Sequence, residues 1–244
     1  MIFIGIIPAR YASTRFPGKP LADIHGKPMI QHVYEKARKA LNDVWVATDD
    51  QRIFNAVENF GGNVVLTSSK HKSGTDRVAE ATAKIAHKIN FDVVINIQGD
   101  EPFVDTAQIN SLKKLFTEKT EIATLIRPIT SVQELFDPNK PKVVVDKNNV
   151  ALYFSRSPIP YVRGKKNEDW INQSEFWAHV GMYAYKKNIL QELTKLEHGK
   201  LEVIESLEQL RWLENGYKIL TAVTNSTGFG IDTPEDLEKA LQLF

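Results

Sequence analysis

The sequence predicts an α/β protein with a doubly wound, mainly parallel sheet and a smaller inserted lobe of mixed sheet. Over the first half of the chain, short apolar strand patterns alternate with amphipathic helix patterns. After Asp105 the pattern changes to strand segments with less helix between them. No internal repeat, low-complexity tract or Gly/Ser linker separates the two parts, so we expect them to share one compact body.

The first half carries four apolar runs with a bias toward β-branched residues, which predict strands at 2–7, 44–48, 64–66 and 91–97. The first of these should stop before Pro8. Apolar positions at helical spacing predict helices at 28–41, 50–60 and 75–88. Strands joined by helices in this way imply right-handed crossovers and a parallel sheet.

The second half is expected to open with a helix from about 105 to 119. Strands are predicted at 122–129, 143–146, 151–154, 179–185 and 217–224, and a closing helix at 233–244. A single helix is predicted over 201–214, with Ile204, Leu207, Leu210 and Leu213 as its buried stripe. Its other face would then be exposed to water; that face carries Glu205, Glu208, Gln209 and Trp212.

The composition is that of an ordinary globular protein: 42% of the 244 residues are hydrophobic, 25% are charged, and the net charge is +1. These fractions exclude long disorder and coiled coils, and the near-zero charge argues against nucleic acid as a partner. No cysteine is present, which rules out disulfides and thiolate metal sites. No stretch approaches the ~20 apolar residues of a membrane span, and the apolar N-terminus lacks a basic leader. We therefore expect a cytoplasmic protein without membrane contact.

The loop after the first predicted strand, residues 8–20, combines cations with hydroxyls. Arg10, Arg15 and Lys19 lie within ten residues, together with two hydroxyl side chains and Gly18. An extended triphosphate requires this mixture of charge and hydrogen-bond donors. The ATPase P-loop spacing and the dinucleotide-binding glycine pattern are both absent. A solvated basic loop is the alternative interpretation. Ligands of open α/β sheets bind at the carboxyl ends of the strands, where this loop lies.

Two aspartates are candidate metal ligands. Asp100 comes directly after the strand at 91–97 and follows Gly99. Asp232 precedes a helix start in which Thr233 is the expected N-cap and Pro234 the first helical residue, so Asp232 is not needed for capping. Mg²⁺ prefers one or two carboxylates together with substrate phosphates. Both acids could hold one ion only if the fold brings their loops together.

Eight segments carry a resemblance to a known family: 8–21, 46–49, 73–77, 96–102, 151–156, 179–183, 207–211 and 230–237. The first of them reads Pro-Ala-Arg-Tyr-Ala-Ser-Thr-Arg, followed by Pro-Gly-Lys-Pro-Leu. In this order they resemble the 3-deoxy-manno-octulosonate cytidylyltransferases, the CMP-Kdo synthetases, over nearly the whole chain. The resemblance implies a fold like that of nucleotide-diphospho-sugar transferases. It also implies a reaction in which CTP and the sugar acid Kdo give CMP-Kdo and pyrophosphate, for lipopolysaccharide biosynthesis, with Mg²⁺.

The family pattern also assigns residues to roles. It implies that Lys19, Asp100 and Asp232 are catalytic, with the two aspartates holding Mg²⁺. The implied CTP contacts are Pro8, Ala9, Arg10, Ser13, Arg15, Lys19, Ser73, Gly74, Thr75, Arg77 and Gln98. The implied Kdo contacts are Gln98, Arg156, His179, Glu208 and Gln209. From pattern alone, His179 would be interpreted as structural.

The resemblance further implies a single cytidylyltransferase domain over 1–244 and a homodimer. We expect a nucleotide-binding core at about 1–120 and 217–244, and a sugar-binding and dimerisation lobe at about 121–216. Ala178 stands where members of the family often carry Arg, and Val203 stands where some carry His, so an amino-sugar variant of Kdo is an alternative substrate. A CMP-sialic acid synthetase would carry Gly-Gly-Ser-Lys where Tyr11 to Arg15 stands here. A non-catalytic nucleotide-binding module is the third alternative.

Overall fold

The computed structural model describes residues 1–226 and 228–243, and they form two compact units. The first unit comprises 1–110, 184–194 and the described part of 227–244. The second comprises 111–183 and 195–226. This division differs from the expected one in three places: residues 111–120 and 217–226 belong to the second unit, and 184–194 belong to the first.

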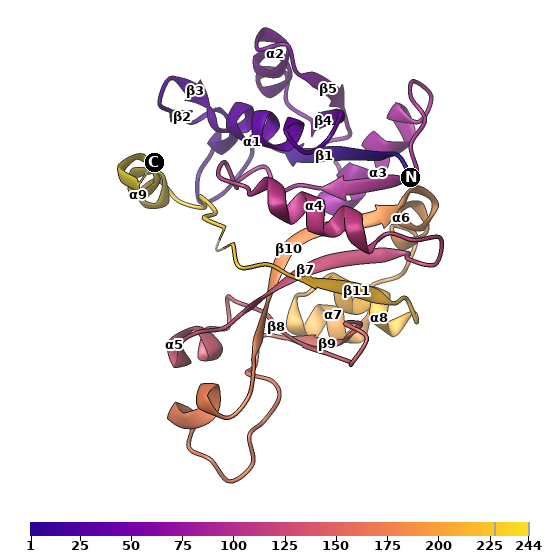
Figure 1. The fold of residues 1–244 in the computed structure, drawn as a ribbon. Coiled ribbons are helices and arrows are strands. Elements are labelled where there is room, and N and C mark those ends of the chain that lie inside the picture. The colour runs from indigo at the N-terminus through magenta and orange to yellow at the C-terminus, as the bar shows by residue number, and fades with distance from the viewer. Residues whose placement is uncertain (227, 244) are drawn as a thin grey trace. The chain divides into compact units, whose positions relative to one another are not determined.

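The first unit is built on a parallel sheet with the strand order β6-β1-β4-β5. Its strands are β1 (Phe3–Ala9), β4 (Asp43–Thr48), β5 (Asn63–Leu66) and β6 (Val93–Asn96). The chain moves outward from β1 through β4 to β5 and returns past β1 to β6. Right-handed crossovers therefore put α1 and α2 on one face and α3 on the other, an arrangement that can be followed in Figure 1. The doubly wound parallel sheet predicted from the sequence is confirmed.

Apart from the helix over 187–193, which was not predicted, the helices of this unit begin close to the predicted positions. They are α1 (Met29–Arg38), α2 (Gln51–Asn59), α3 (Gly74–Ile85), α6 (Lys187–Leu193) and α9 (Pro234–Leu243), with α4 (Thr106–Leu115) ending in the second unit. Short elements complete it: η1 (Lys19–Leu21), β2 (Asp23–Ile24) and β3 (Lys27–Pro28). Asp50 caps α2 and Ser73 caps α3, each accepting a backbone N–H of the first turn.

Strand β1 continues through Pro8 to Ala9, so the expectation that it stops before Pro8 was wrong. The carbonyl of Ile6 accepts the N–H of Ile97, the last bond on the β6 side. Pro8 follows Ile6 by two residues, so its nitrogen faces the β6 side of the strand as Ile6 does. At this point β6 no longer pairs with β1. A proline costs no ladder bond there. The carboxyl end of β1 thereby reaches the site described below.

The C-terminal segment packs beside the loop that follows β1. Ile231 and Ala240 are fully buried in one cluster with Ile24 and Met29, and Phe16 packs against it. Burying such side chains contributes about 1.5–3 kcal/mol each. The cluster brings Asp232, next to Ile231, to the same region as the loop of residues 10–18.

The second unit contains the mixed sheet predicted for the lobe. Its strands are β7 (Ile122–Pro128), β8 (Lys142–Val145), β9 (Ala151–Ser155), β10 (Trp177–Lys186) and β11 (Ile219–Val223). Of β10, the part up to Tyr183 belongs to this unit. β11 pairs with β7 in parallel, whereas β8 pairs with β9 and β10 antiparallel. The remaining elements are α5 (Val132–Phe136), η2 (Asn167–Asn172), α7 (Lys200–Glu205) and α8 (Gln209–Glu214).

The single helix predicted over 201–214 was wrong, because the chain turns between α7 and α8. Ser206 adopts the left-handed conformation, with φ of 50°, and ends α7. The turn removes Ile204 from the expected buried stripe and leaves it 80% exposed. It also buries Gln209 and Trp212, which the helical pattern had placed on the water-facing side.

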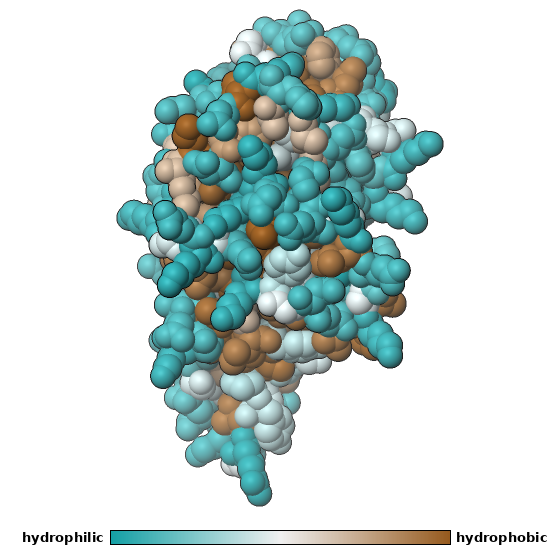
Figure 2. Space-filling view, turned by 90° about the vertical axis from the view of Figure 1, so that its right-hand side faces the viewer, coloured by the Kyte–Doolittle hydropathy of each residue, from teal (hydrophilic) through white to brown (hydrophobic). Residues whose placement is uncertain are grey.

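No helix within the described residues is long and apolar enough to cross a membrane. The face of the molecule drawn in Figure 2 is mostly hydrophilic, and its hydrophobic groups are interspersed among polar ones. Scattered apolar side chains of this kind are ordinary on a water-exposed protein surface.

Candidate active site

The loop between β1 and η1, residues 10–18, is closed at its base by a backbone hydrogen bond. The N–H of Gly18 donates to the carbonyl of Tyr11 at 2.9 Å. Gly18 has φ of 74°, and a Cβ at this position would lie 3.0 Å from the Tyr11 ring. Glycine is therefore required at this turn for both conformation and space. Arg10 and Arg15 are exposed on the loop, so both guanidinium groups can reach an anion from solvent.

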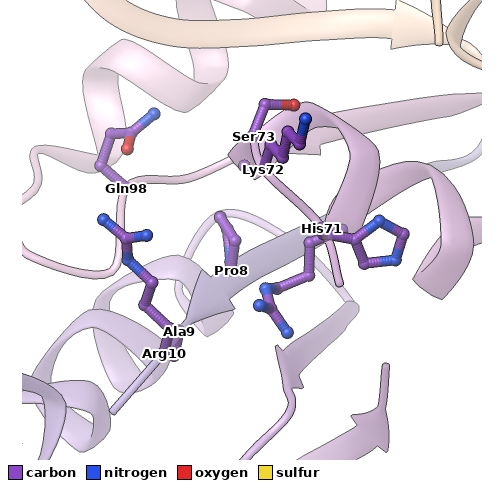
Figure 3. A pocket seen from close by; sticks show the side chains of 9 residues that line it. Pro8, Ala9, Arg10, His71, Lys72, Ser73 and Gln98 are labelled. Atoms are coloured by element: carbon purple, nitrogen blue, oxygen red, sulfur yellow. The ribbon is translucent and has the colours of Figure 1, made fainter. Parts of the chain in front are cut away.

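A cavity of about 180 Å³ opens at the carboxyl end of β1 within the first unit. It is lined by Pro8, Ala9, Arg10, His71, Lys72, Ser73, Gly74, Arg77 and Gln98. Figure 3 shows Arg10 and Gln98 on one side and the segment from His71 to Ser73 on the other. Seven of the residues predicted to contact CTP thus share one cavity. Three cations and no acid line it, which suits an anionic ligand.

Arg77 is held within the wall of this cavity. Its NH1 donates to Thr67 Oγ1 at 2.7 Å and its NH2 to Asp49 Oδ2 at 2.8 Å. The side chain is buried, and the Asp49 carboxylate balances its charge. Arg77 therefore fixes the loop before α3, while Ser73 accepts the N–H of Asp76 as the helix cap.

Lys19, Asp100 and Asp232 meet at one point of the first unit. The Lys19 ammonium lies 2.8 Å from Asp100 Oδ2 and 3.0 Å from Asp232 Oδ1. Arg15 NH2 lies 3.1 Å from the same oxygen of Asp232. Because both carboxylates contact one nitrogen atom, their oxygens are no farther apart than the sum of the two Lys19 distances. The fold therefore brings together the two aspartates that lie far apart in the sequence.

Two features hold the aspartates in place. The N–H of Ile231 donates to the carbonyl of Asp100 at 2.9 Å, which ties the two loops directly. The Asp236 N–H donates to Thr233 Oγ1, and the Asp236 carboxylate accepts the N–H of Thr233. This reciprocal capping confirms the helix start predicted from the sequence and leaves the Asp232 side chain to Lys19 and Arg15.

Glu101, next to Asp100, is the third acid at this point. Burial, with a further contribution from the charge of Asp100, raises the pKa of Glu101 to about 7. No group of three or more His, Cys, Asp or Glu side chains suited to a metal is found within the described residues. A site with only two carboxylates suits Mg²⁺, which takes its remaining ligands from water and substrate phosphates.

The residues predicted to contact Kdo in the second unit gather around the turn between α7 and α8. Gln209 is 5% exposed, and its Nε2 has no hydrogen-bond partner among the described residues. The His179 ring packs 5.2 Å from that of Tyr183, which in turn packs 5.1 Å from Trp212 of α8. The charge of Glu208 acts on the Tyr183 hydroxyl, so it too lies near this group.

Arg156 makes a different set of contacts from the one expected of a carboxylate-binding residue. Its guanidinium donates to the carbonyls of Glu205, Ser206 and Pro138 at 2.6, 3.2 and 2.9 Å. These bonds engage three of the five N–H groups of the side chain. Arg156 could therefore bind the carboxylate of the sugar acid, as predicted, only through its two other N–H groups.

The His179 ring carries a defined proton arrangement. Thr124 Oγ1 donates its single proton to a backbone carbonyl, that of Met182 being 2.9 Å away. His179 Nε2, 3.0 Å from this hydroxyl, must therefore donate to it, and Nδ1 of the neutral ring is an acceptor. Burial lowers the pKa of His179 to about 4, so the ring is neutral near pH 7.

We expect the half-buried His179 imidazole to remain neutral at pH 6, where exposed histidines are largely protonated. Its folded-state pKa of about 4 lies below the unfolded value near 6.5, so the unfolded chain binds more protons in this interval. The free energy of unfolding should therefore fall by about 2 kcal/mol between pH 6.5 and 5 because of this group. NMR titration of the ring and urea unfolding of wild type and His179→Gln test this. A ring that titrates near pH 6.5 would contradict it.

Sequence reasoning missed two residues of the cavity, His71 and Lys72. They directly precede Ser73, Gly74 and Thr75, which were predicted to contact CTP. Their position just before a helix N-terminus could have indicated that they line the same cavity. It also missed Thr124 and Tyr183 around His179. The Thr124 contact joins β7 to β10 and has no signature in local sequence, whereas Tyr183 lies on β10 with His179, inside the motif at 179–183.

Residues 4–219 match the protein family described as Cytidylyltransferase. The chain is 59% identical over 246 residues to the 3-deoxy-manno-octulosonate cytidylyltransferase of Parabacteroides distasonis, with 99% of this chain and 97% of the relative covered. It is 54% identical to the one of Bacteroides thetaiotaomicron, with 98% and 97% covered. A solved CMP:2-keto-3-deoxy-manno-octonic acid synthetase complexed with CTP superposes with a TM-score of 0.92 at 44% identity, covering 100% of this chain and 98% of that one. A cytidylyltransferase from Leptospira borgpetersenii, with a TM-score of 0.63 and 16% identity over 99% of this chain and 85% of its own, shares the fold alone.

Proposed function

Because the chain belongs to the cytidylyltransferase family, and within it to the 3-deoxy-manno-octulosonate cytidylyltransferases, we propose that it activates Kdo with CTP. The products are CMP-Kdo and pyrophosphate, and CMP-Kdo supplies lipopolysaccharide biosynthesis. The observation that carries this proposal is the 59% identity over 99% of the chain to a relative of that name. The cation-lined cavity and the adjacent pair of aspartates support it with the chemistry that the reaction needs.

The test of the proposal is pyrophosphate release from CTP in the presence of Mg²⁺, measured with Kdo, with an amino-sugar variant of Kdo, with sialic acid and without any sugar. Release that depends on Kdo is expected. Pyrophosphate release that depends only on the amino sugar, or only on sialic acid, would identify that sugar as the substrate in place of Kdo. No release with any of them would leave a non-catalytic nucleotide-binding module.

The nucleotide would bind at the carboxyl end of β1. The cavity that contains Arg10, Gln98 and the Ser73–Gly74 turn would receive CTP, with its cations offsetting phosphate charge. The loop of residues 10–18, with Ser13, Arg15 and then Lys19, would surround the triphosphate. Its guanidinium and ammonium groups would offset the phosphate charge, and hydroxyls and backbone N–H groups would orient the oxygens.

The reaction would be an in-line attack of the Kdo anomeric hydroxyl on the α-phosphorus, in which pyrophosphate leaves. Such transfers depend chiefly on positioning and on neutralisation of charge. Asp100 and Asp232 would hold Mg²⁺, which when bound supplies Lewis acidity toward phosphate and hydroxyl oxygens. Lys19, half-enclosed between them in the ligand-free chain, would offset charge that develops on the leaving group.

The sugar would be recognised by the group around the turn between α7 and α8. The Gln209 Nε2 is a buried donor that a ligand hydroxyl can satisfy. The neutral His179 offers Nδ1 as an acceptor, and Glu208 adds a carboxylate. Arg156 would bind the carboxylate of the sugar acid through its remaining N–H groups.

Replacing Gln209 by alanine should raise the KM for Kdo about tenfold to a hundredfold and change the KM for CTP less than about threefold. The reason is that the ligand hydroxyl loses the hydrogen bond from this buried donor. Initial rates with each substrate varied in turn measure the split. The exposed Gln133→Ala is the matched control. Equal effects on both substrates would remove Gln209 from the sugar site.

A homodimer and a cytoplasmic location complete this proposal. Both follow from the family resemblance and from substrates of the kind found in the cytoplasm. Light scattering at several concentrations tests the first, and cell fractionation tests the second.

A further inference from the structure

The segment 67–73 joins β5 to α3 and forms one wall of the cavity. His71, Lys72 and Ser73 line the cavity from this segment. Its two ends are fixed: Thr67 donates its N–H to the carbonyl of Thr48 and accepts from Arg77, while Ser73 caps α3. The middle of the segment, 68–72, has no place in a strand or a helix, so side chains must determine its conformation.

Glu80, on the second turn of α3, contacts this middle part from outside the cavity. Its Oε2 accepts the N–H of Ser68 at 2.8 Å and is hydrogen-bonded to His71 Nε2. Its Oε1 pairs with the Lys84 ammonium at 2.7 Å. Burial opposes ionisation, but Lys84, the Ser68 N–H and His71 together lower the pKa of Glu80 to about 2. The carboxylate is therefore charged at every pH at which the protein works.

The His71 ring contacts Glu80 and does not point into the centre of the cavity. Figure 3 shows the ring directed away from Arg10 and Gln98, on the far side of the segment. One carboxylate thus engages a backbone N–H at one end of 68–72 and a side chain near the other. Hydrogen bonds to a charged group are about twice as strong as neutral ones. Fixing a segment before the ligand arrives reduces the conformational entropy lost on binding.

We propose that Glu80 is a positioning residue of the nucleotide cavity, whose carboxylate holds the 67–73 segment through Ser68 and His71 so that Lys72 and Ser73 face the nucleotide. This inference rests on the proposed function, since it takes the ligand of the cavity to be CTP. Glu80 touches no substrate. Its effect is transmitted through the backbone of the segment.

The experiment measures CTP binding by calorimetry with Mg²⁺ and steady-state rates with CTP and Kdo. Glu80→Ala should weaken CTP binding about twentyfold, and the isosteric Glu80→Gln about fivefold. The turnover number at saturating CTP should change less than about threefold in both variants, because Lys19, Asp100 and Asp232 are untouched. Lys84→Met is the matched control: it removes the other partner of Glu80, together with the Lys84 hydrogen bond to the Leu66 carbonyl at the end of β5, and leaves the Ser68 and His71 contacts in place, so CTP binding should stay within about twofold.

A double-mutant cycle separates positioning from a general loss of stability. His71→Ala should weaken CTP binding, and combining it with Glu80→Ala should add little, because both changes release the same segment. Additive losses, or an equal fall in the turnover number, would overturn the proposal. If the wild type binds CTP, and both Glu80→Gln and Glu80→Ala bind it as tightly as the wild type does, this inference alone fails. If the wild type does not bind CTP, the proposed function fails with it.

Discussion

Replacing Asp100 by asparagine is expected to lower the turnover number at least about a thousandfold. The change keeps the size of the side chain and removes the charge that a divalent cation needs. Asp232→Asn should have an effect of the same order, because both carboxylates contact the same Lys19 ammonium and so face one position. Pyrophosphate release from CTP and Kdo at saturating Mg²⁺ measures both variants.

Folding can be checked separately from activity. Asp100 and Asp232 are partly exposed, and their contacts are with Lys19 and Arg15 at the edge of the first unit, so the variants should unfold at close to the wild-type temperature. Asp169→Asn, an exposed aspartate on η2, is the matched control and should retain full turnover. A rate within tenfold of wild type for Asp100→Asn or for Asp232→Asn would remove that residue from the metal site.

Local sequence was sufficient where local physics determines the structure. The apolar runs identified β4 and β5 to within a residue. In β4 the reason is burial in the sheet, which favours a continuous apolar run, whereas β5 is a half-buried strand at the end of the sheet order that its β-branched residues were enough to mark. The Thr233–Asp236 capping pair was equally local, and the bonds it predicts are present. The first-unit cavity followed from a topological rule about strand ends and from the family motifs.

What sequence could not predict depends on the non-local fold or on backbone strain. Ser206 adopts a left-handed conformation that glycine or asparagine would have signalled, so the break between α7 and α8 had no marker. Ile204 has the helical spacing of a buried residue, but the turn at Ser206 leaves its side chain exposed. Lys19 reaches Asp100 and Asp232 across 81 and 213 residues of sequence, and no local pattern encodes such a contact. The family pattern could mark these three residues as catalytic without indicating that the lysine lies between the aspartates.

That position of Lys19 leads to a prediction with two effects of opposite sign. The ammonium occupies the position between the carboxylates, at 2.8 and 3.0 Å, and so competes with a divalent cation for them. In Lys19→Met, Mg²⁺ should bind the ligand-free protein about tenfold more tightly, since the competing charge is gone. The turnover number should nevertheless fall about a hundredfold or more, because the cation opposite the leaving pyrophosphate is lost as well.

Calorimetric Mg²⁺ titration and pyrophosphate release measure the two effects of the lysine substitution independently. Arg15→Met is the matched control: it removes a mostly exposed cation that pairs with one of the two aspartates, Asp232, so its effect on Mg²⁺ affinity should be smaller. In an Asp100→Asn background the gain in Mg²⁺ affinity should disappear, because the carboxylate for which lysine and metal compete is absent. If Lys19→Met loses turnover with no gain in Mg²⁺ affinity, the lysine and the metal do not share the aspartates.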